Sequence, residues 1–485
     1  MRLKHKFIFF ILFHFFAALS LLFILASPLR SQERFRRSPP LPEPFPALSL
    51  PLIETHTLTN GLGIAIVRKQ DQPVISMRLI IMAGESSSPD NLPGLATLSA
   101  RMLTKGSVNL KAESIEEKIE SVGGNFAIRT YPDYTEFTFS FLGEYLEEAL
   151  QLLGEILLRP TFPRIEIGNV QRSMFYDLAI QSNNPEFIAR RLLFQILFES
   201  HPYRKIIFDQ GGIKNLSRRD IVTFYSQHYR PNNAKLVLIG NLNLEMASRT
   251  VSRYLSPWEK QESEQPSVPL LNPRDKIKIC FVDLPQAKDV TIYLGNIIFP
   301  ITSKDYFPFI VFNQVIGGTP NSRLFMNLRE SKAYAYYAFS EMQFFRNCGV
   351  FLITAKVLPE FTHDAIQEIL QQINSLRNVQ IPGQEIEQAK SYLIGNFPLK
   401  IETNNDLSAK LAEIQAFNLS RDHWERYYEK IKRINSEMVS GMGEKYSLHT
   451  PVIVIVGNNE IMEYLMDFAQ VSVYSPDGSF RYEIK

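Results

Sequence analysis

Cysteine is scarce in this chain, which has only Cys280 and Cys348 among 485 residues. Two thiols cannot build a disulfide framework or a thiolate zinc site, although one bridge could form in an exported protein. An excess of charge of either sign is also missing, because 52 Lys and Arg face 50 Asp and Glu for a formal net charge of +2. Nothing in this balance points to the basic surface of a nucleic-acid-binding protein, so we expect no nucleic-acid partner.

Histidine is the third scarce residue, with eight in the chain. A catalytic zinc ion usually takes three protein ligands, drawn from neutral imidazole, thiolate and carboxylate groups. No two of the histidines stand at the spacing of two ligands on one helical face, and we interpret each as an ordinary surface or core residue. They are His5, His14, His56, His201, His228, His363, His423 and His449.

The amino-terminal segment has the order of an export signal. Three basic residues among the first six precede an apolar run over residues 7–27. The run is long for a signal peptide, and about 20 apolar residues suffice to span a bilayer. We therefore predict that residues 1–32 are a signal peptide or a membrane anchor, and that the protein is exported, either periplasmic or anchored facing the periplasm. Residues 33–51 are rich in proline and are predicted to form a tether.

An internal repeat organises the rest of the chain. GEYLEEAL at residues 143–150 matches PEFTHDAI at residues 359–366, an offset of 359 − 143 = 216. LVLIGN at residues 236–241 matches IVIVGN at residues 453–458, an offset of 458 − 241 = 217. An alternating apolar segment typical of a strand precedes both members of the first match, TEFTFSFL at residues 135–142 and VFLITAK at residues 350–356. The two nearly equal offsets indicate a duplicated unit.

The order of elements within each unit predicts the fold class. Strands come first, helices follow and a strand closes the unit, which favours an α+β fold of two homologous domains, each a mixed β-sheet covered on one side by helices. We place the amino-terminal domain at residues 52–255 and the carboxy-terminal domain at residues 275–485. Residues 256–274 are polar and contain four prolines, so they are predicted to link the two domains.

One predicted helix has an unusual polar face. In residues 94–107, GLATLSARMLTKGS, three apolar residues at spacings of three and four form a stripe that should face a core. Thr97, Ala100 and Arg101 stand on a second face, at the spacing of two metal ligands and a general base. None of these three side chains is a good metal ligand or a proton acceptor.

The duplicated halves and this helix resemble the pitrilysin/insulinase family of inverted zinc peptidases, whose signature is H-x-x-E-H. Four further segments match the landmarks of that family in the same order along the chain. They are HTLTNGLGIAIVRKQDQPVISMRLIIMAGES at residues 56–86, HPYR at 201–204, YRPNNAKLVLIGN at 229–241 and SRLFMNLRESKAYAY at 322–336. The resemblance covers essentially the whole chain after the tether.

The resemblance indicates which family residues correspond to Thr97, Ala100 and Arg101. Thr97 and Arg101 stand where active relatives have histidine ligands, and Ala100 stands where they have the glutamate that activates water. The third ligand of the family corresponds to Asp177 in this sequence. A guanidinium about 4 Å from a divalent ion would be repelled by about 8 kcal/mol at an effective dielectric constant near 20. We therefore expect this chain to bind no zinc.

The resemblance also implies two substrate-binding features. Arg329 and Tyr336 match an arginine and a tyrosine, seven residues apart, that hold the substrate backbone near the scissile bond in the family. The alternative is that Arg329 pairs with a surface carboxylate and that Tyr336 packs on a sheet.

The second feature is the segment SVGGNFAIRT at residues 121–130. It resembles the strand to which extended peptides add in active relatives, although an ordinary strand explains it as well. The residues expected to contact peptide are Gly123, Gly124 and Asn125.

These features together imply a chain that is inactive on its own. We expect a non-catalytic subunit of an exported heteromeric zinc metallopeptidase, lending Arg329 and Tyr336 to a zinc-bearing homologous partner, as in some bacterial heterodimers of the family. The alternative is a catalytically dead scaffold or peptide-binding protein, comparable with the core subunits of the respiratory bc complex. A self-sufficient peptidase would require zinc in the isolated chain.

Overall fold

The computed structural model describes residues 51–484, with gaps at 206, 209, 263–270, 272–273, 379, 421 and 469. The predicted leader at residues 1–32 and all but the last residue of the predicted tether at 33–51 lie outside the described residues, as does part of the predicted linker at 256–274. Within the described part of the chain, no helix is both long enough and apolar enough to cross a membrane.

The first half of the chain builds a six-stranded mixed sheet in the order β1-β2-β6-β3-β5-β4. β2 and β6 run parallel, and all other neighbouring strands run antiparallel. The alternating sequence of β5 explains its place, since its three phenylalanines all face the buried core. The strands are β1 (Ile53–Thr57), β2 (Gly63–Arg68), β3 (Val74–Ile81), β4 (Asn125–Thr130), β5 (Thr135–Leu142) and β6 (Ala234–Gly240).

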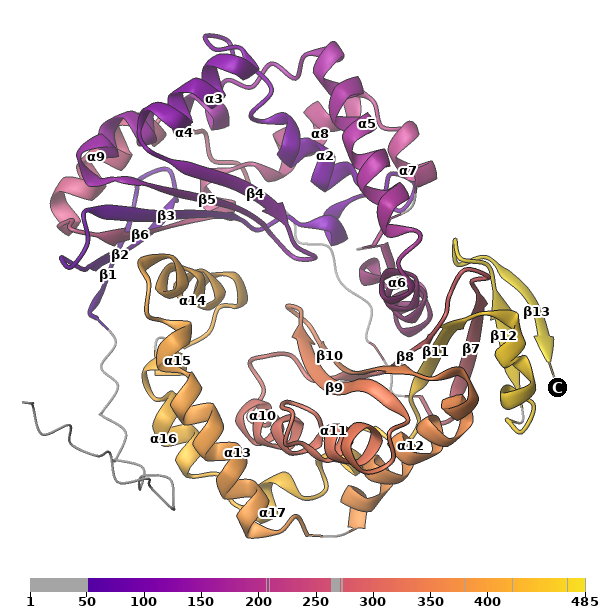
Figure 1. Cartoon of the computed structure of the whole chain (residues 1–485). Coiled ribbons are helices and arrows are strands. Elements are labelled where there is room, and N and C mark those ends of the chain that lie inside the picture. Colours follow the sequence, from indigo (N-terminus) through magenta and orange to yellow (C-terminus); the bar gives the residue numbers. More distant parts are fainter. Residues whose placement is uncertain are drawn as a thin grey trace, which may run out of the picture. The chain divides into compact units, whose positions relative to one another are not determined.

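Helices from the first half cover one face of this sheet (Figure 1). The predicted helix over residues 94–107 is α2, which is shorter than predicted and buries its apolar stripe. A capping box starts α8, where the Ser217 hydroxyl accepts from the backbone N–H of Asp220 and the Asp220 carboxylate accepts from the backbone N–H of Ser217. The helices of the first half, of which all but α6 belong to this layer, are α2 (Leu95–Met102), α3 (Ala112–Ser121), α4 (Leu146–Leu158), α5 (Arg164–Gln181), α6 (Pro185–Phe198), α7 (Gln210–Lys214), α8 (Arg218–His228) and α9 (Leu244–Leu255).

The second half builds a seven-stranded sheet in the order β13-β12-β7-β11-β8-β10-β9. Its segment β7-β11-β8-β10-β9 repeats the order β2-β6-β3-β5-β4 of the first sheet, with the first pair parallel and the others antiparallel. The same arrangement in both sheets supports the predicted duplication. The strands are β7 (Lys278–Asp283), β8 (Val290–Ile298), β9 (Ala335–Phe344), β10 (Gly349–Val357), β11 (Val452–Gly457), β12 (Val471–Tyr474) and β13 (Phe480–Ile484).

The helices of the second half pack mainly on one face of this second sheet, around a large apolar core. A π-helical segment, Met326–Ser331, directly follows the short helix α11. The helices are α10 (Tyr306–Ile316), α11 (Arg323–Phe325), α12 (Thr362–Asn378), α13 (Gly383–Asn396), α14 (Asn404–Phe417), α15 (Asp422–Glu425), α16 (Tyr427–Lys432), α17 (Ser436–Val439) and α18 (Met442–Lys445).

The two halves exchange one helix each. α6 packs against β8 and β11 of the second sheet, whereas α14 packs against β3 and β6 of the first (Figure 1). Apolar residues of α6 share a core with the outward face of the second sheet, where Cys280 and Cys348 lie buried and unbonded. The α+β fold of two sheets with helices is confirmed. The sequence did not predict that each sheet is covered on its second face by a helix from the other half.

Candidate functional site

The start of α2 is held by a buried carboxylate, Glu85, in the loop that follows β3. One carboxylate oxygen accepts hydrogen bonds from the backbone N–H of Gly94 at 2.5 Å and from the hydroxyl of Ser88 at 2.9 Å. The other accepts from the backbone N–H of Thr97 at 3.2 Å and from its hydroxyl at 2.8 Å. Glu85 therefore satisfies two backbone donors of the first helical turn and places a negative charge at the positive end of the helix dipole.

The environment of Glu85 changes its acidity and fixes Thr97. Burial raises the pKa of the Glu85 carboxyl, against the opposing effect of its hydrogen bonds, the largest of which comes from the Thr97 hydroxyl. The Thr97 hydroxyl donates to Glu85, so at this position, which the resemblance aligns with a metal ligand, the side chain helps to anchor α2. The sequence reasoning missed Glu85, because the contact depends on a loop that folds back over nine residues to the helix.

The other two altered positions of α2 differ in their surroundings. Ala100 is buried in the protein interior. Arg101 is partly exposed, and its Nη1 donates a hydrogen bond to Oδ2 of Asp177 on α5 at 3.0 Å. The structure thus brings together Arg101 and Asp177, two positions that the family resemblance had aligned with metal ligands. The side chains are 40% and 50% exposed, so this pair contributes at most about 1 kcal/mol to stability.

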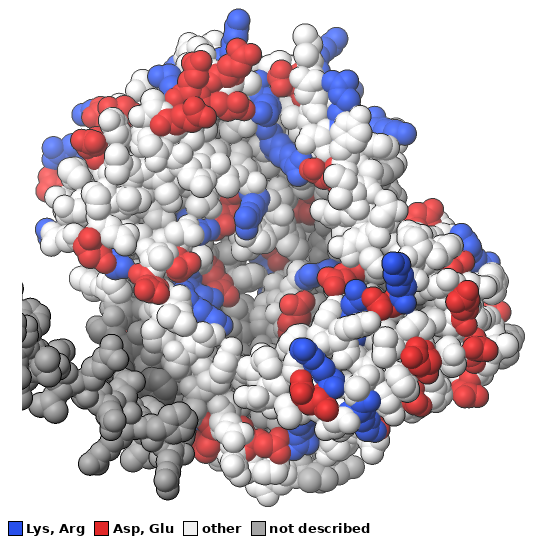
Figure 2. Space-filling view, in the orientation of Figure 1, with Lys and Arg blue, Asp and Glu red and all other residues white. Residues whose placement is uncertain are grey.

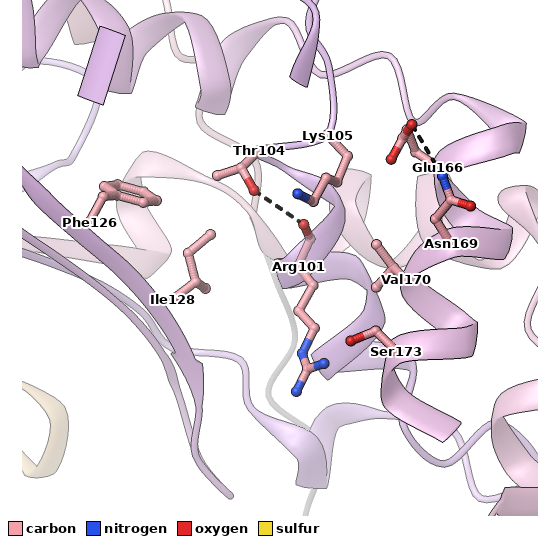
Figure 3. A pocket seen from close by; sticks show the side chains of 9 residues that line it. All are labelled: Arg101, Thr104, Lys105, Phe126, Ile128, Glu166, Asn169, Val170 and Ser173. Atoms are coloured by element: carbon pink, nitrogen blue, oxygen red, sulfur yellow. Dashed lines mark hydrogen bonds between the residues drawn. The ribbon is translucent and has the colours of Figure 1, made fainter. Parts of the chain in front are cut away.

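A cavity of about 400 Å³ lies beside Arg101, between α2, α5 and β4 (Figure 3). Basic, polar and apolar side chains share its wall. They are Arg101, Thr104, Lys105, Phe126, Ile128, Glu166, Asn169, Val170 and Ser173. A second cavity of about 270 Å³ is lined by Arg101 and Asp177 together with mainly apolar residues of α5, α6 and the loop before α7. Arg101 belongs to both cavities.

The predicted peptide-docking segment forms the edge of the first sheet, since β4 pairs with β5 on one side and ends the strand order. Asn125 is its first residue. Gly123 adopts a positive φ of 61°, which favours glycine. A Cβ on Gly124 would lie 2.6 Å from the Phe139 ring and 2.8 Å from the carbonyl oxygen of Ile119. Both glycines therefore have a structural reason to be present, and their contact with peptide remains a prediction.

Arg329 and Tyr336 lie at the start of the β9 edge of the second sheet. Arg329 is in the π-helical segment, where its guanidinium stands 4.9 Å from the centre of the Phe325 ring and its Nε lies 3.7 Å from Glu330. Tyr336 is the second residue of β9 and is 52% exposed, with Nζ of Lys356 at 5.9 Å from the centre of its ring. Both side chains are accessible to a ligand.

The donor set near α2 does not form a metal site. Within the described ranges, no three His, Cys, Asp or Glu side chains lie close enough together to hold a metal ion. Asp177 is the single carboxylate at the aligned positions, and it pairs with a guanidinium. A zinc ion would need further electron-pair donors at positions 97 and 101, which the structure fills with a hydroxyl bonded to Glu85 and a cation.

Comparison with known proteins places this geometry in a family. Residues 63–211 match the model of the insulinase family, peptidase family M16, and residues 215–393 match the model of the peptidase M16 inactive domain. The chain belongs to peptidase family M16. The resemblance drawn from the sequence is confirmed; the first match lies within the first half, and the second runs from the last part of the first half into the second.

Relatives in family M16 have mixed names. An uncharacterized zinc protease YmxG from Bacillus subtilis is 19% identical over 398 residues, which cover 81% of this chain and 95% of the relative. A protein from Helicobacter pylori named non-peptidase homolog YmxG is 25% identical over 362 residues, which cover 72% of this chain and 81% of the relative. The names thus include both zinc proteases and a homologue called a non-peptidase.

Solved structures share the fold of this M16 chain. A peptidase M16 inactive domain from Pseudomonas fluorescens superposes with a TM-score of 0.79 at 23% identity, covering 84% of this chain and 98% of that one. A protease from Helicobacter pylori gives a TM-score of 0.79 at 20% identity, covering 84% of this chain and 100% of that one. At these identities the likeness establishes the two-domain fold.

Proposed function

We propose that this M16 chain is a non-catalytic subunit of a heteromeric zinc metallopeptidase. A zinc-bearing homologous subunit would hydrolyse the peptide, and this chain would contribute Arg329 and Tyr336 to hold it. The observation that carries the proposal is the state of the former zinc helix. There, the hydroxyl of Thr97 is bonded to Glu85, Ala100 is buried, and Arg101 is paired with Asp177.

The chemistry of these groups argues against hydrolysis by this chain alone. Ala100 offers no proton acceptor for an attacking water, and Arg101 would repel a divalent ion placed at the same point. We infer that any zinc in the assembly is held by the partner. We further propose that residues 1–32 direct the assembly out of the cytoplasm, with the tether at residues 33–51 between that segment and the fold.

Arg329 and Tyr336 would supply hydrogen-bond donors for the substrate backbone to a partner that lacks such a pair. A guanidinium and a phenol both donate hydrogen bonds, and a carbonyl oxygen accepts them more strongly as it becomes negative during attack by water. Both side chains are exposed at the β9 edge, where no deep burial prevents contact with a peptide. Removing one such donor from an enzyme costs on the order of 3 kcal/mol of transition-state stabilisation.

The test begins with the assembly as it exists in the source cells. The tagged chain is purified under mild conditions, and co-purifying chains are identified by mass spectrometry. We expect a homologue with an intact H-x-x-E-H motif, stoichiometric zinc in the complex, and hydrolysis of a mixed peptide pool. Arg329→Ala should lower kcat/KM by about 100-fold or more.

Arg249→Ala is the matched control, because Arg249 is an exposed arginine of α9 that pairs with Glu245 on the same helix. It should leave turnover unchanged. Unchanged turnover in Arg329→Ala would reject the proposed role and favour a scaffold that supports the partner without touching the peptide.

A further inference from the structure

The cavity of about 400 Å³ beside Arg101 is lined by two basic side chains and by one carboxylate, that of Glu166, which accepts a hydrogen bond from Nδ2 of Asn169 at 3.4 Å. Arg101 and Lys105 both line it, and both come from α2 or the turn that follows α2. Figure 2 shows basic side chains along the hollow between the acidic surface over α3 and the helices near α5. Lys105 lies 3.1 Å from Glu116, whose side chain is 60% exposed, so solvent screens this pair strongly.

The Arg101 guanidinium has unused hydrogen-bonding capacity. Its Nη1 donates to Asp177, whereas its Nε and Nη2 have no hydrogen-bond partner among the described residues. In Figure 3 the hydroxyl of Ser173 points toward Arg101, and this hydroxyl also has no partner within the described ranges. A planar guanidinium with two free donor groups is suited to a carboxylate, which it can bind through two parallel hydrogen bonds.

The opposite part of the wall is apolar and belongs to a strand with a free edge. Phe126 and Ile128 of β4 line the cavity, together with Val170 of α5. An extended peptide added to β4 would form backbone hydrogen bonds along that edge. Its final side chain could then pack on the apolar wall while its terminal carboxylate meets Arg101. The cavity volume of about 400 Å³ leaves room for one side chain and a carboxylate.

We propose that this cavity recognises the C-terminal carboxylate of an extended peptide that ends in an apolar residue, with Arg101 as its main contact and Lys105 as a second cation. The inference rests on the proposed function in taking a peptide as the ligand of this chain. It goes further by naming the part of the peptide that is recognised. Arg101, which the resemblance aligns with a metal-binding histidine, would thus bind the peptide carboxylate directly.

The experiment uses the isolated full chain and two fluorescein-labelled peptide pools. Both pools have five random positions followed by a C-terminal leucine, and they differ only in ending as a free acid or as an amide. Fluorescence polarisation should give a Kd for the acid pool about tenfold or more below that of the amide pool, in keeping with a charge-assisted bidentate contact. Arg101→Gln should abolish the difference, and Arg101→Lys should retain part of it.

Arg249→Gln serves as the control for lost surface charge and should bind like the unchanged chain. Circular dichroism and thermal unfolding verify that every variant is folded. Equal affinity for acid and amide pools, binding of neither pool, or discrimination that survives in Arg101→Gln would each overturn the inference. These results do not depend on Arg329 or on a partner, so the turnover test of the proposed function can fail or succeed separately.

Discussion

The exchanged helix α14 provides a test of how the two halves are held together. Arg78 on β3 pairs with Glu136 on β5 at 2.6 Å, with the two side chains only 8% and 7% exposed. The same guanidinium donates through Nε to the hydroxyl of Ser408 at 2.7 Å and through Nη2 to Oδ1 of Asn405 at 2.9 Å, both on α14. Arg78 therefore links two strands of the first sheet to a helix of the second half.

The substitution Arg78→Met should remove this link and leave the Glu136 carboxylate buried without its counterion. Breaking a buried ion pair from one side costs about 3–5 kcal/mol, because the remaining charge keeps its desolvation penalty. Arg78→Met combined with Glu136→Leu removes both charges and should recover most of that loss. Arg249→Met, which breaks a pair that is 73% and 83% exposed, should change the free energy of unfolding by at most about 0.5 kcal/mol.

Urea unfolding at pH 7 measures these differences. The chain has two tryptophans, Trp258 in the core of the first half and Trp424 in that of the second, so single replacements by phenylalanine give a separate fluorescence reporter for each half. Both reporters should show the lower stability of Arg78→Met. A loss below about 1 kcal/mol, or no recovery in the double variant, would refute the interpretation of Arg78 and Glu136 as a stabilising buried ion pair.

Two further predictions concern buried titratable groups. Burial lowers the pKa of His423 to about 4, so the stability that its neutral form contributes is complete above pH 6.5 and is lost as the pH falls toward 4. In urea unfolding between pH 7 and 4.5, His423→Phe should therefore lose about 2.5 kcal/mol less stability than the unchanged chain. Equal losses would contradict the lowered pKa of His423. Glu85→Ala should lower the free energy of unfolding by about 3 kcal/mol, because it leaves the backbone N–H groups of Gly94 and Thr97 unpaired. Hydrogen exchange should then be faster in the first turn of α2. Protection equal to that of the unchanged chain would refute the role of Glu85 as the cap of α2.

Local patterns in the sequence were enough to predict many of the elements. The alternation in residues 135–142 matches β5 residue for residue, and the segment at 350–356 lies within β10. The capping box of Ser217 and Asp220 is likewise readable from the sequence, because it depends only on two residues three apart. Duplication could also be predicted, since the two nearly equal offsets of 216 and 217 residues are read from the sequence without any tertiary structure.

Contacts between segments far apart in the sequence could not be predicted from local sequence patterns. The apolar residues of α6 indicate burial, but nothing in their spacing says that the second sheet covers them. The bond between Glu85 and Thr97 depends on a loop conformation, and the cavity beside Arg101 depends on how α2, α5 and β4 come together. The residues at the altered motif could be named from the sequence, whereas the groups that surround them required the structure.

The most direct test of the central claim is the zinc content and peptidase activity of the isolated, full-length chain. After dialysis against a zinc-containing buffer and then a metal-free one, we expect no stoichiometric zinc by mass spectrometry of the metal and no cleavage of a mixed peptide pool. The combined substitution Thr97→His, Ala100→Glu, Arg101→His and Asp177→Glu is the positive control, and it should retain zinc because three ligands return to α2 and α5. An unchanged chain that holds one tightly bound zinc ion and cleaves peptides by itself would contradict the account.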